Sequence, residues 1–537
     1  MSRSSEQNIQ PKSEAGQPGV LGQPGGPKPA PVPSGLKAIS PSAFGYEQAR
    51  HLLWRAAFGG TPKQIQTLAS WGPERAVDYL LDYDKVSYEH PAKDLFDKAI
   101  MRPPTDEERR MYAMAQRARD EDALAEARLR RQDMQRRDRQ QIQDVQKWWL
   151  KRMVESPRPT EEKLSLFWHG HFATSYRTIE NSYHMYLQNE LFRTSAVGNF
   201  GTMLKGIIRD PAMIAYLNNN DSRKNKPNEN LAREIMELFG LGIGNYTEKD
   251  IKEGARALTG YTFRDDEFYF DQRNHDNGTK SILGKTGPLN GEQFVDAILA
   301  QPACSYLISR KLYHFLVADL PPLEQSKAGD ADLEPASRSV IREMATQLKG
   351  SDYELKPVLK RLLTSEHFYH PKFVNEQIKS PVTLVVGAVR SLDVPPRDLS
   401  LINDALNLMG QDIFFPPSVK GWDGGRSWIN TSTLFVRQNI MAYMLTGKKP
   451  QGYDATADAQ KYDPSPLLGE LLQADATAAQ DSAKVTDYML RLTLGRSPEA
   501  ARAQIEGFLK PFEGRIDRDV LVGALLLITA MPEYQLC

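Results

Sequence analysis

The segment 227–263 constrains the fold more than any other part of the chain. Its first half, PNENLAREIMELFG, places apolar residues on one arc of a helical wheel and polar, mostly charged residues on the other. The glycine-rich LGIGN that follows predicts a left-handed helix end. Thr247, with Asp250 three residues later, predicts the N-cap of a second helix over residues 248–258. We therefore expect the chain to be organised around a polar helix that stops abruptly.

The polar arc of this first helix has two interpretations. Glu229 and Arg233, and again Arg233 and Glu237, stand at the i,i+4 spacing of ion pairs on a solvated helix face. Alternatively, the arc is the inner wall of a site, where an arginine orients buried carboxylates. The histidine motifs discussed below favour the second interpretation. It predicts that Glu229, Arg233 and Glu237 are poorly exposed.

Helical periodicity recurs along most of the chain, and strand signals are few. We predict a mainly α fold: a helical core over residues 41–445, a polar linker over 446–464 and a helical segment of the same body over 465–537. Residues 1–40 are rich in Gly and Pro and are expected to form a disordered tail. In the irregular segment after residue 263, residues 267–270 and 280–283 are expected to pair as one small hairpin.

Residues 105–154 carry the longest helical signal. A Thr105–Glu108 capping box opens it, and neither Gly nor Pro interrupts it. Acidic and basic residues alternate densely over its first two thirds, while apolar residues are sparse. This pattern predicts one long, charged, projecting helix. A coiled-coil arm is the alternative, although the heptads are poor.

Composition excludes several classes of protein. Lys plus Arg and Asp plus Glu number 68 each, so no charge excess points to nucleic acid. Two cysteines exclude a disulfide framework, and no apolar run reaches the roughly 18 residues of a membrane span. The start of the chain lacks the apolar core of an export signal. We expect a cytoplasmic protein, unless it is exported with a partner or its start is misassigned.

A metal site is the sharpest prediction from the motifs. In WHGHF, Gly170 allows a kink that could bring His169 and His171 to one side. Two imidazoles and carboxylates are typical ligands of zinc, iron or manganese. The carboxylates would come from the polar helix: Glu229, Glu234 and Glu237. His275 and Asp276, from the irregular segment, would transfer protons, and Arg233 would hold a carboxylate or an anionic substrate group.

Two glycine-rich segments were compared with known site motifs. GTKSILGKTG has the wrong spacing for a triphosphate-binding loop, and no helix signal follows it. GWDGGRSWIN, residues 421–430, combines Trp422, Asp423, Arg426, Trp428 and Asn430. Such a loop could stack a sugar ring. The alternative interpretation is a rigid plug of the helical core.

A set of motifs in fixed order resembles the bacterial "domain of unknown function 1800" family. The motifs are WHGHF, DPAMIAYLNN, the whole segment 227–263, NHDNGTKSILG, SRKLYHFLV and PPSVKGWDGGRSWINTSTL. The resemblance runs from about residue 43 to the C-terminus. The family has no established activity. It implies a partner: members are often encoded beside a "domain of unknown function 1501" protein, which resembles the sulfatase and alkaline-phosphatase group.

Three functions remain open on these observations. The first is a metal-dependent hydrolase built on the His/Glu set. The second is a non-enzymatic helical partner or scaffold for the sulfatase-like protein or for a polysaccharide. The third is a non-haem iron oxidoreductase with two histidines and one carboxylate.

Overall fold

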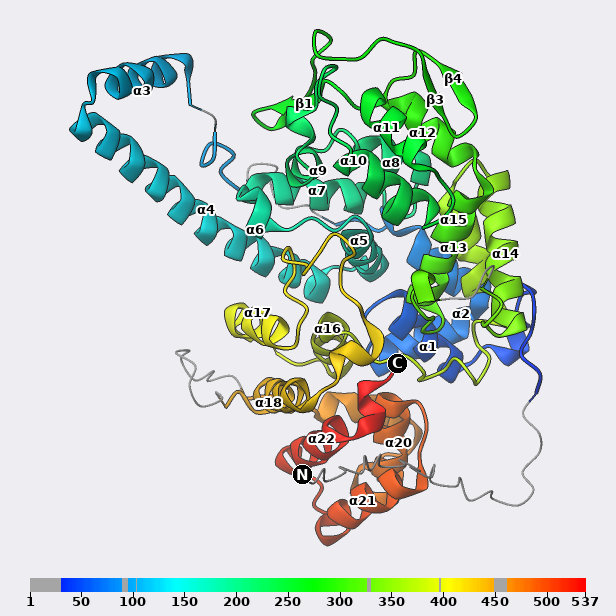
Figure 1. The fold of residues 1–537 in the computed structure, drawn as a ribbon. Helices are drawn as coiled ribbons and strands as arrows, with labels where there is room; N and C mark the ends of the chain where they lie inside the picture. Colours follow the sequence, from blue (N-terminus) through cyan, green and yellow to red (C-terminus); the bar gives the residue numbers. More distant parts are fainter. Residues whose placement is uncertain (1–29, 89–94, 103, 326–329, 396, 449–460) are drawn as a thin grey trace, which may run out of the picture. The chain divides into compact units, whose positions relative to one another are not determined.

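Helical periodicity becomes α-helix along most of the chain in a computed structural model of the protein (Figure 1). The structure describes residues 30–88, 95–102, 104–325, 330–395, 397–448 and 461–537. Within these residues it contains twenty-two α-helices and two small antiparallel sheets. The predicted mainly α fold is confirmed.

The first part of the chain surrounds one central helix. Twelve of the thirteen residues of α5 are buried, which is expected only of a helix packed on all sides. Helices α1, α2, α4 and α7 all contact it. The helices of this part are α1 (Tyr46–Ala56), α2 (Pro62–Leu81), α3 (Asp106–Ala118), α4 (Glu121–Glu155), α5 (Pro159–His171), α6 (Tyr176–Ile179), α7 (Ser182–Thr194), α8 (Phe200–Ile207) and α9 (Pro211–Tyr216).

The predicted long charged helix is two helices, which corrects that prediction. Arg119 has a left-handed φ of 53°, and the side chain of Asp120 caps the N-terminus of α4. Helix α3 folds back on α4, and an Arg130–Glu108 ion pair of 2.6 Å links them. The sequence pattern hides the break, because a left-handed arginine ends α3 and an aspartate cap begins α4 without Gly or Pro.

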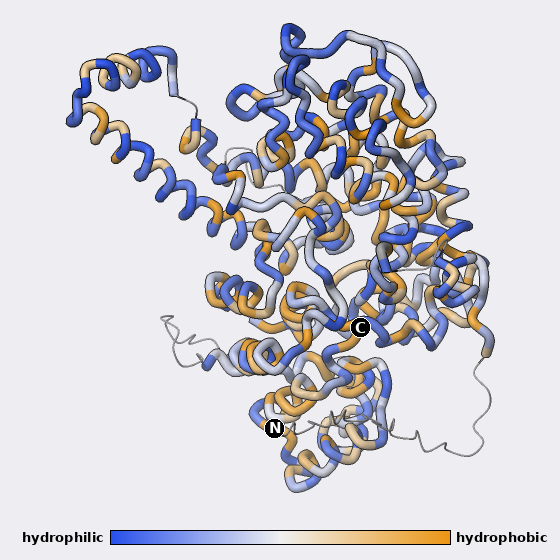
Figure 2. Tube along the Cα trace, viewed as in Figure 1, coloured by the Kyte–Doolittle hydropathy of each residue, from blue (hydrophilic) through white to orange (hydrophobic). Residues whose placement is uncertain are grey.

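The outer part of this helical pair is exposed. Helix α3 buries no residue, and the first buried residue of α4 is Asp138. In Figure 1, α3 and the start of α4 lie apart from the other helices, and Figure 2 shows that this part is largely hydrophilic. Met111, Met114 and Leu129 are nevertheless 63%, 68% and 66% exposed.

The middle of the chain contains the polar helix and the second helix predicted for the segment 227–263. Helix α10 (Asn230–Glu234) continues into a π-helix, η4 (Ile235–Leu241), and then α11 (Glu248–Ala257) begins at the predicted Thr247–Asp250 capping box. Helices α12 (Gly291–Ala300) and α13 (Pro302–Leu316) pack against η4.

The irregular segment forms two hairpins and not the single predicted one. Strand β1 (Tyr261–Arg264) pairs with β2 (Glu267–Phe270), and β3 (Lys280–Ile282) pairs with β4 (Lys285–Gly287). The two predicted strands exist, but each pairs with its nearest neighbour through a two-residue turn. Positive φ angles at Asp265 (53°) and at Leu283–Gly284 (49° and 86°) make these turns possible.

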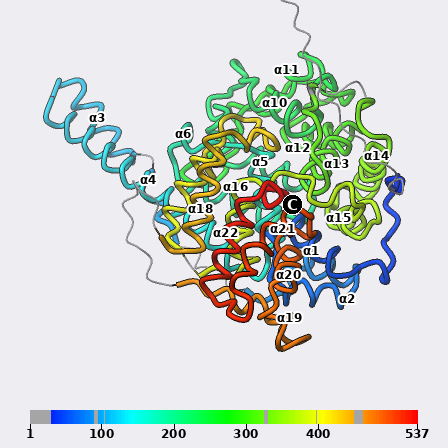
Figure 3. The backbone as a smooth tube through the Cα atoms, turned by 90° about the horizontal axis from the view of Figure 1, so that it is seen from below, coloured from blue at the N-terminus to red at the C-terminus, as the bar shows by residue number. Residues whose placement is uncertain are grey.

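The remaining helices complete the body. Helix α21 contacts both α20 and α22, and α18 joins them to the rest through α22 (Figure 3). The bounds are α14 (Pro335–Gly350), α15 (Leu355–Leu363), α16 (Pro381–Leu392), α17 (Leu399–Leu408), α18 (Thr431–Thr446), α19 (Gly469–Ala474), α20 (Ser482–Leu494), α21 (Glu499–Leu509) and α22 (Arg518–Ala530). Residues 449–460 of the predicted linker lie outside the described residues.

The predicted tail differs from the structure at its inner end. Residues 1–29 lie outside the described residues, but residues 33–537 form one compact unit. Leu36 and Ile39 are buried, and the Ile39 amide donates to the Thr364 carbonyl at 2.8 Å. None of the described helices has the length and apolar character needed to span a bilayer.

Candidate functional site

The polar helix changes its hydrogen-bond pattern in the middle of the motif. A regular α-helix lasts only from Asn230 to Glu234, and η4 then follows as a π-helix. Gly240 suits the wider turn, because a Cβ there would lie 2.7 Å from the Ile235 carbonyl oxygen and from a methyl of Ile298. The helical wheel drawn for this segment assumed a regular α-helix, and this assumption is wrong for the residues after Glu234. Single π-turns are frequent at functional sites.

Side chains from other helices close the C-terminal end of η4. Lys311 of α13 donates to the Leu238 carbonyl at 2.8 Å, and His171 Nε2 lies 3.2 Å from the Phe239 carbonyl. Asn245 donates to the Leu241 carbonyl at 3.0 Å. The carbonyls at a helix end lack partners within the helix. These three side chains supply them.

His171 is thereby fixed in one neutral form. Its Nε2 must carry the proton, because the Phe239 carbonyl can only accept; its Nδ1 then accepts from the Lys311 ammonium at 3.0 Å. Burial, followed by the charge of Lys311, lowers the pKa of His171 well below its ordinary value. Both ring nitrogens are thus engaged in closing the π-helix.

His169 anchors a loop. The Phe414 amide donates to its Nε2 at 3.1 Å, so the proton of the neutral ring is on Nδ1. Nδ1 is buried without a hydrogen-bond partner, and the Trp149 ring meets the imidazole edge to face at 5.2 Å. Burial lowers the pKa of His169 to about 3. This histidine is neutral and surrounded by aromatic rings.

The Trp-containing loop lies against the glycine between the two histidines. A Cβ on Gly421 would be 2.4 Å from the Gly170 carbonyl oxygen, so only glycine permits this contact. Trp428 is buried, as the plug interpretation predicts, whereas Trp422 is half-buried, and its ring lies 5.7 Å from that of His169. Lys420, the residue before Gly421, exerts a charge effect on Glu234 that lowers the pKa of this carboxyl.

Two half-buried carboxylates form the centre of the candidate site. Burial, and then the charge of Glu237, raises the pKa of Glu234; Arg233 and Lys420 offset only part of this. Glu237 accepts a hydrogen bond of 2.5 Å from the Tyr246 hydroxyl. The site therefore offers a carboxyl group that retains its proton more readily than an ordinary one, next to a second, oriented carboxylate.

Glu229 and Arg233 belong to the rim of this site. Arg233 pairs with Glu229 at 3.2 Å and with Glu248 at 2.8 Å. The Arg233 and Glu229 side chains are 34% and 38% exposed, and Glu237 is half-buried. The expected burial of all three is thus only partial.

The two residues predicted for proton transfer are bound elsewhere. His275 Nδ1 lies 2.8 Å from the Thr259 carbonyl, and Asp276 accepts from Arg256 at 2.7 Å. Arg256 first, and the Gly278 amide as a weaker contributor, outweigh burial and hold the pKa of Asp276 below its ordinary value. These bonds fasten the irregular segment to α11. No hydrogen bond or ion pair among the described residues joins either side chain to Glu234 or Glu237.

The predicted donor set was compared with the needs of a metal ion. Among the described residues, no group of three or more His, Cys, Asp or Glu side chains is arranged to hold one. In this arrangement His171 would have to leave Lys311 and Phe239 before it could ligate a metal. The zinc, iron or manganese ion stays a prediction.

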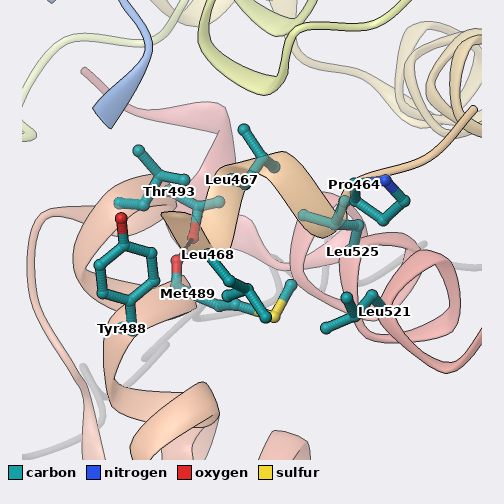
Figure 4. A pocket seen from close by; sticks show the side chains of 9 residues that line it. Pro464, Leu467, Leu468, Tyr488, Met489, Thr493, Leu521 and Leu525 are labelled. Carbon is teal, nitrogen blue, oxygen red and sulfur yellow. Dashed lines mark hydrogen bonds between the residues drawn. The ribbon is translucent and has the colours of Figure 1, made fainter. Parts of the chain in front are cut away.

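Two cavities lie elsewhere. The crevice drawn in Figure 4, among Leu467, Met489 and Leu525, has a volume of only about 10 Å³, enough for about one water. A groove of about 970 Å³ runs past the end of η4, along Leu241, Ile243 and Tyr306. Neither is lined by the two carboxylates.

Fold and site together define a mainly α protein with a carboxylate pair where an α-helix becomes a π-helix. The chain matches the family model described as "Protein of unknown function (DUF1800)" over residues 51–536, so it belongs to that family. The predicted family resemblance is confirmed. No curated protein and no solved structure matches the chain.

Proposed function

We propose that this protein is a hydrolase whose acid–base chemistry is carried by Glu234 and Glu237. One observation carries the proposal: two half-buried carboxyl groups stand three residues apart, and the pKa of Glu234 is raised by burial and then by its neighbour. The raised pKa means that Glu234 retains its proton to a higher pH than an ordinary glutamate does.

The roles follow from the surroundings of each carboxyl. Glu234 would donate its proton to the oxygen of the leaving group as the bond breaks. Glu237, oriented by the Tyr246 hydroxyl, would take a proton from a water whose oxygen attacks the substrate. Lys420 and Arg233, whose charges both act on Glu234, would hold polar groups of the substrate at the rim.

The substrate class is suggested by the neighbouring loop. Trp422 is half-buried, and Lys420 of the same loop acts on Glu234 through its charge. A partly exposed indole ring is the kind of surface on which a sugar ring stacks. We therefore propose a glycoside as the substrate.

The test compares hydrolysis of a panel of para-nitrophenyl glycosides by the wild-type protein and two variants. Glu234→Gln and Glu237→Gln are each expected to lower kcat by about 100-fold or more. Glu366→Gln is the control, since this residue only forms a surface ion pair with Lys37 at 2.9 Å. Absence of hydrolysis by the wild type, or equal activity in all variants, would overturn the proposal.

A divalent metal is a proposed addition to the same site. If zinc, iron or manganese binds, Glu234 and Glu237 supply its oxygen ligands, and the metal would activate the attacking water. Metal analysis of the purified protein decides this. Stoichiometric metal that is lost in the Glu234→Gln, Glu237→Gln double variant supports the ion. Full activity in metal-free protein contradicts it.

A second candidate function is binding of a partner protein by α3 and the outer part of α4. Met111, Met114 and Leu129 are more than half exposed on helices that bury nothing before Asp138. Such exposed apolar side chains on a charged arm are typical of contact surfaces. The partner we propose is the sulfatase-like protein that the family resemblance implies.

Co-purification of the two proteins tests this candidate. The variant Met111→Glu, Met114→Glu, Leu129→Glu should abolish association and leave the circular dichroism spectrum unchanged. Association that survives these three substitutions would contradict a role for the arm.

A further inference from the structure

A separate cavity lies among α2, α16 and the segment that joins α4 to α5. Its volume is about 240 Å³. Leu53, Leu68 and Leu80 form part of its wall, together with the ring of Trp71. A cavity of roughly 150 Å³ can hold a benzene molecule, so this one accommodates a small organic molecule.

Arg390 of α16 lines this cavity with part of its hydrogen-bonding capacity unused. Its Nη1 donates to the carbonyls of Met153, Val154 and Ser156, at 3.2, 2.7 and 3.0 Å, and thereby closes the C-terminus of α4. Its Nε is buried and has no hydrogen-bond partner. Burial lowers the pKa of Arg390 to about 10, and the Tyr79 hydroxyl offsets part of this effect.

Lys63 adds a second positive charge to the wall of the cavity, and no lining residue adds a negative one. Lys63 lines the cavity, is exposed, and forms no ion pair within the described part of the chain. No Asp or Glu is among the lining residues. The nearby acids of α2, Glu74 and Asp78, instead pair with Lys360 of α15, at 3.3 and 2.7 Å. The cavity is therefore apolar and aromatic in its body and cationic at its polar edge.

We propose that this cavity is a binding site for a small organic anion, a carboxylate on an apolar or aromatic body. The carboxylate would meet Arg390 and Lys63, and the body would lie among Trp71 and the leucines. A charged hydrogen bond of this type is among the stronger polar contacts in proteins. The apolar wall favours such an anion over inorganic phosphate, which would leave the leucines uncovered. The site is independent of the carboxylate pair and of the proposed hydrolase.

Isothermal titration of the full-length protein with benzoate tests the site. Benzyl alcohol, which has the same ring without the charge, and inorganic phosphate, which has charge without the ring, are the comparison probes. We expect benzoate to bind at least tenfold more tightly than either. Lys63→Gln is expected to weaken benzoate binding about tenfold. Lys249→Gln removes the same charge from an exposed position outside the cavity and should change nothing.

Trp71 provides a second readout. Benzoate should change the tryptophan fluorescence of the wild type but not that of Trp71→Phe. Arg390→Gln should weaken binding at least as much as Lys63→Gln does, and Lys63→Gln decides the question if Arg390→Gln fails to fold. No binding of benzoate, equal binding of benzyl alcohol, or unchanged affinity in Lys63→Gln would overturn the proposal.

Discussion

Two clusters of glutamate and arginine differ in how completely their charges are paired. In the first, Glu162 of α5 is fully buried and accepts hydrogen bonds from Trp149 at 2.9 Å, Arg152 at 2.8 Å and Arg193 at 3.0 Å. In the second, Glu234 is half-buried beside Glu237, and the charges of Arg233 and Lys420 offset only part of the rise in its pKa.

The difference shows how surroundings decide what a carboxylate can do. Burial alone raises the pKa of Glu162, but Arg193 and Arg152 outweigh it and hold the pKa below its ordinary value. Burial, followed by the charge of Glu237, raises the pKa of Glu234, and Arg233 and Lys420 do not outweigh them. A fully paired cluster stabilises helix packing, whereas an incompletely paired, accessible one is available for proton transfer.

Removing the central charge of the buried cluster should have the largest effect. Glu162→Gln leaves two buried arginines short of negative charge, and we expect a loss of about 3–5 kcal/mol in the free energy of unfolding. Urea denaturation measures it. The control is Glu155→Gln on the same helix pair, whose contact with Lys151 is exposed and 3.9 Å long. A loss below about 1 kcal/mol for Glu162→Gln would mean that the cluster is not a stability element.

The neighbouring Glu161 should make stability depend on pH. Burial, followed by Glu162, raises the pKa of Glu161 from 4.5 to about 7. Between these values the folded protein binds a proton that the unfolded chain does not. The free energy of unfolding therefore falls as the pH rises through this window, by up to about 3 kcal/mol.

Urea denaturation inside and above this pH window, for the wild type and Glu161→Gln, checks the effect. The variant lacks the titrating group, so its advantage over the wild type should grow as the pH rises. A difference that stays constant with pH would contradict the assignment.

The closure of the π-helix should contribute less. Lys311→Met removes the donor to the Leu238 carbonyl and to His171, and we expect a loss of about 2 kcal/mol. His171→Phe should cost a similar amount. Because the two side chains share one network, the double variant should lose less than the sum. Strict additivity in this double-mutant cycle would show that they act separately.

The rim of the candidate site should contribute least. Arg233→Gln breaks ion pairs whose members are 34%, 38% and 68% exposed, so we expect a change below about 1 kcal/mol in the free energy of unfolding. Thermal and urea denaturation measure it. A larger loss would place Arg233 with the buried cluster and remove the contrast between the two.

Local signals along the chain predicted local structure well. The capping boxes at Thr105 and Thr247 both open helices, and Gly242, with a φ of 81°, ends the polar helix as its LGIGN motif indicates. These features depend on hydrogen bonds between residues close in sequence. The mainly α fold follows from the same signals, summed over many segments.

Signals that depend on distant partners were missed or misassigned. Lys311 lies in the SRKLYHFLV motif, but nothing in the motif indicates its contact, which exists only because α13 passes the end of η4. His169 and His171 were predicted to bind a metal because the sequence shows the two imidazoles without their partners. These partners are the backbone amide of Phe414 for His169 and the backbone carbonyl of Phe239 for His171. The strand pairing in the irregular segment was missed for a different reason, because local two-residue turns decided it.

The sequence by itself determined that this protein is helical, that it belongs to its family, and which polar side chains line the helix 230–241. The tertiary structure alone decided which of those side chains retain unused chemistry. The physical reason is that helix formation depends on neighbouring residues, whereas the protonation and pairing of a side chain depend on burial and on charges from distant segments. Both side chains are affected by burial. The charge from a distant segment is that of Lys420 at Glu234 and that of Lys311 at His171.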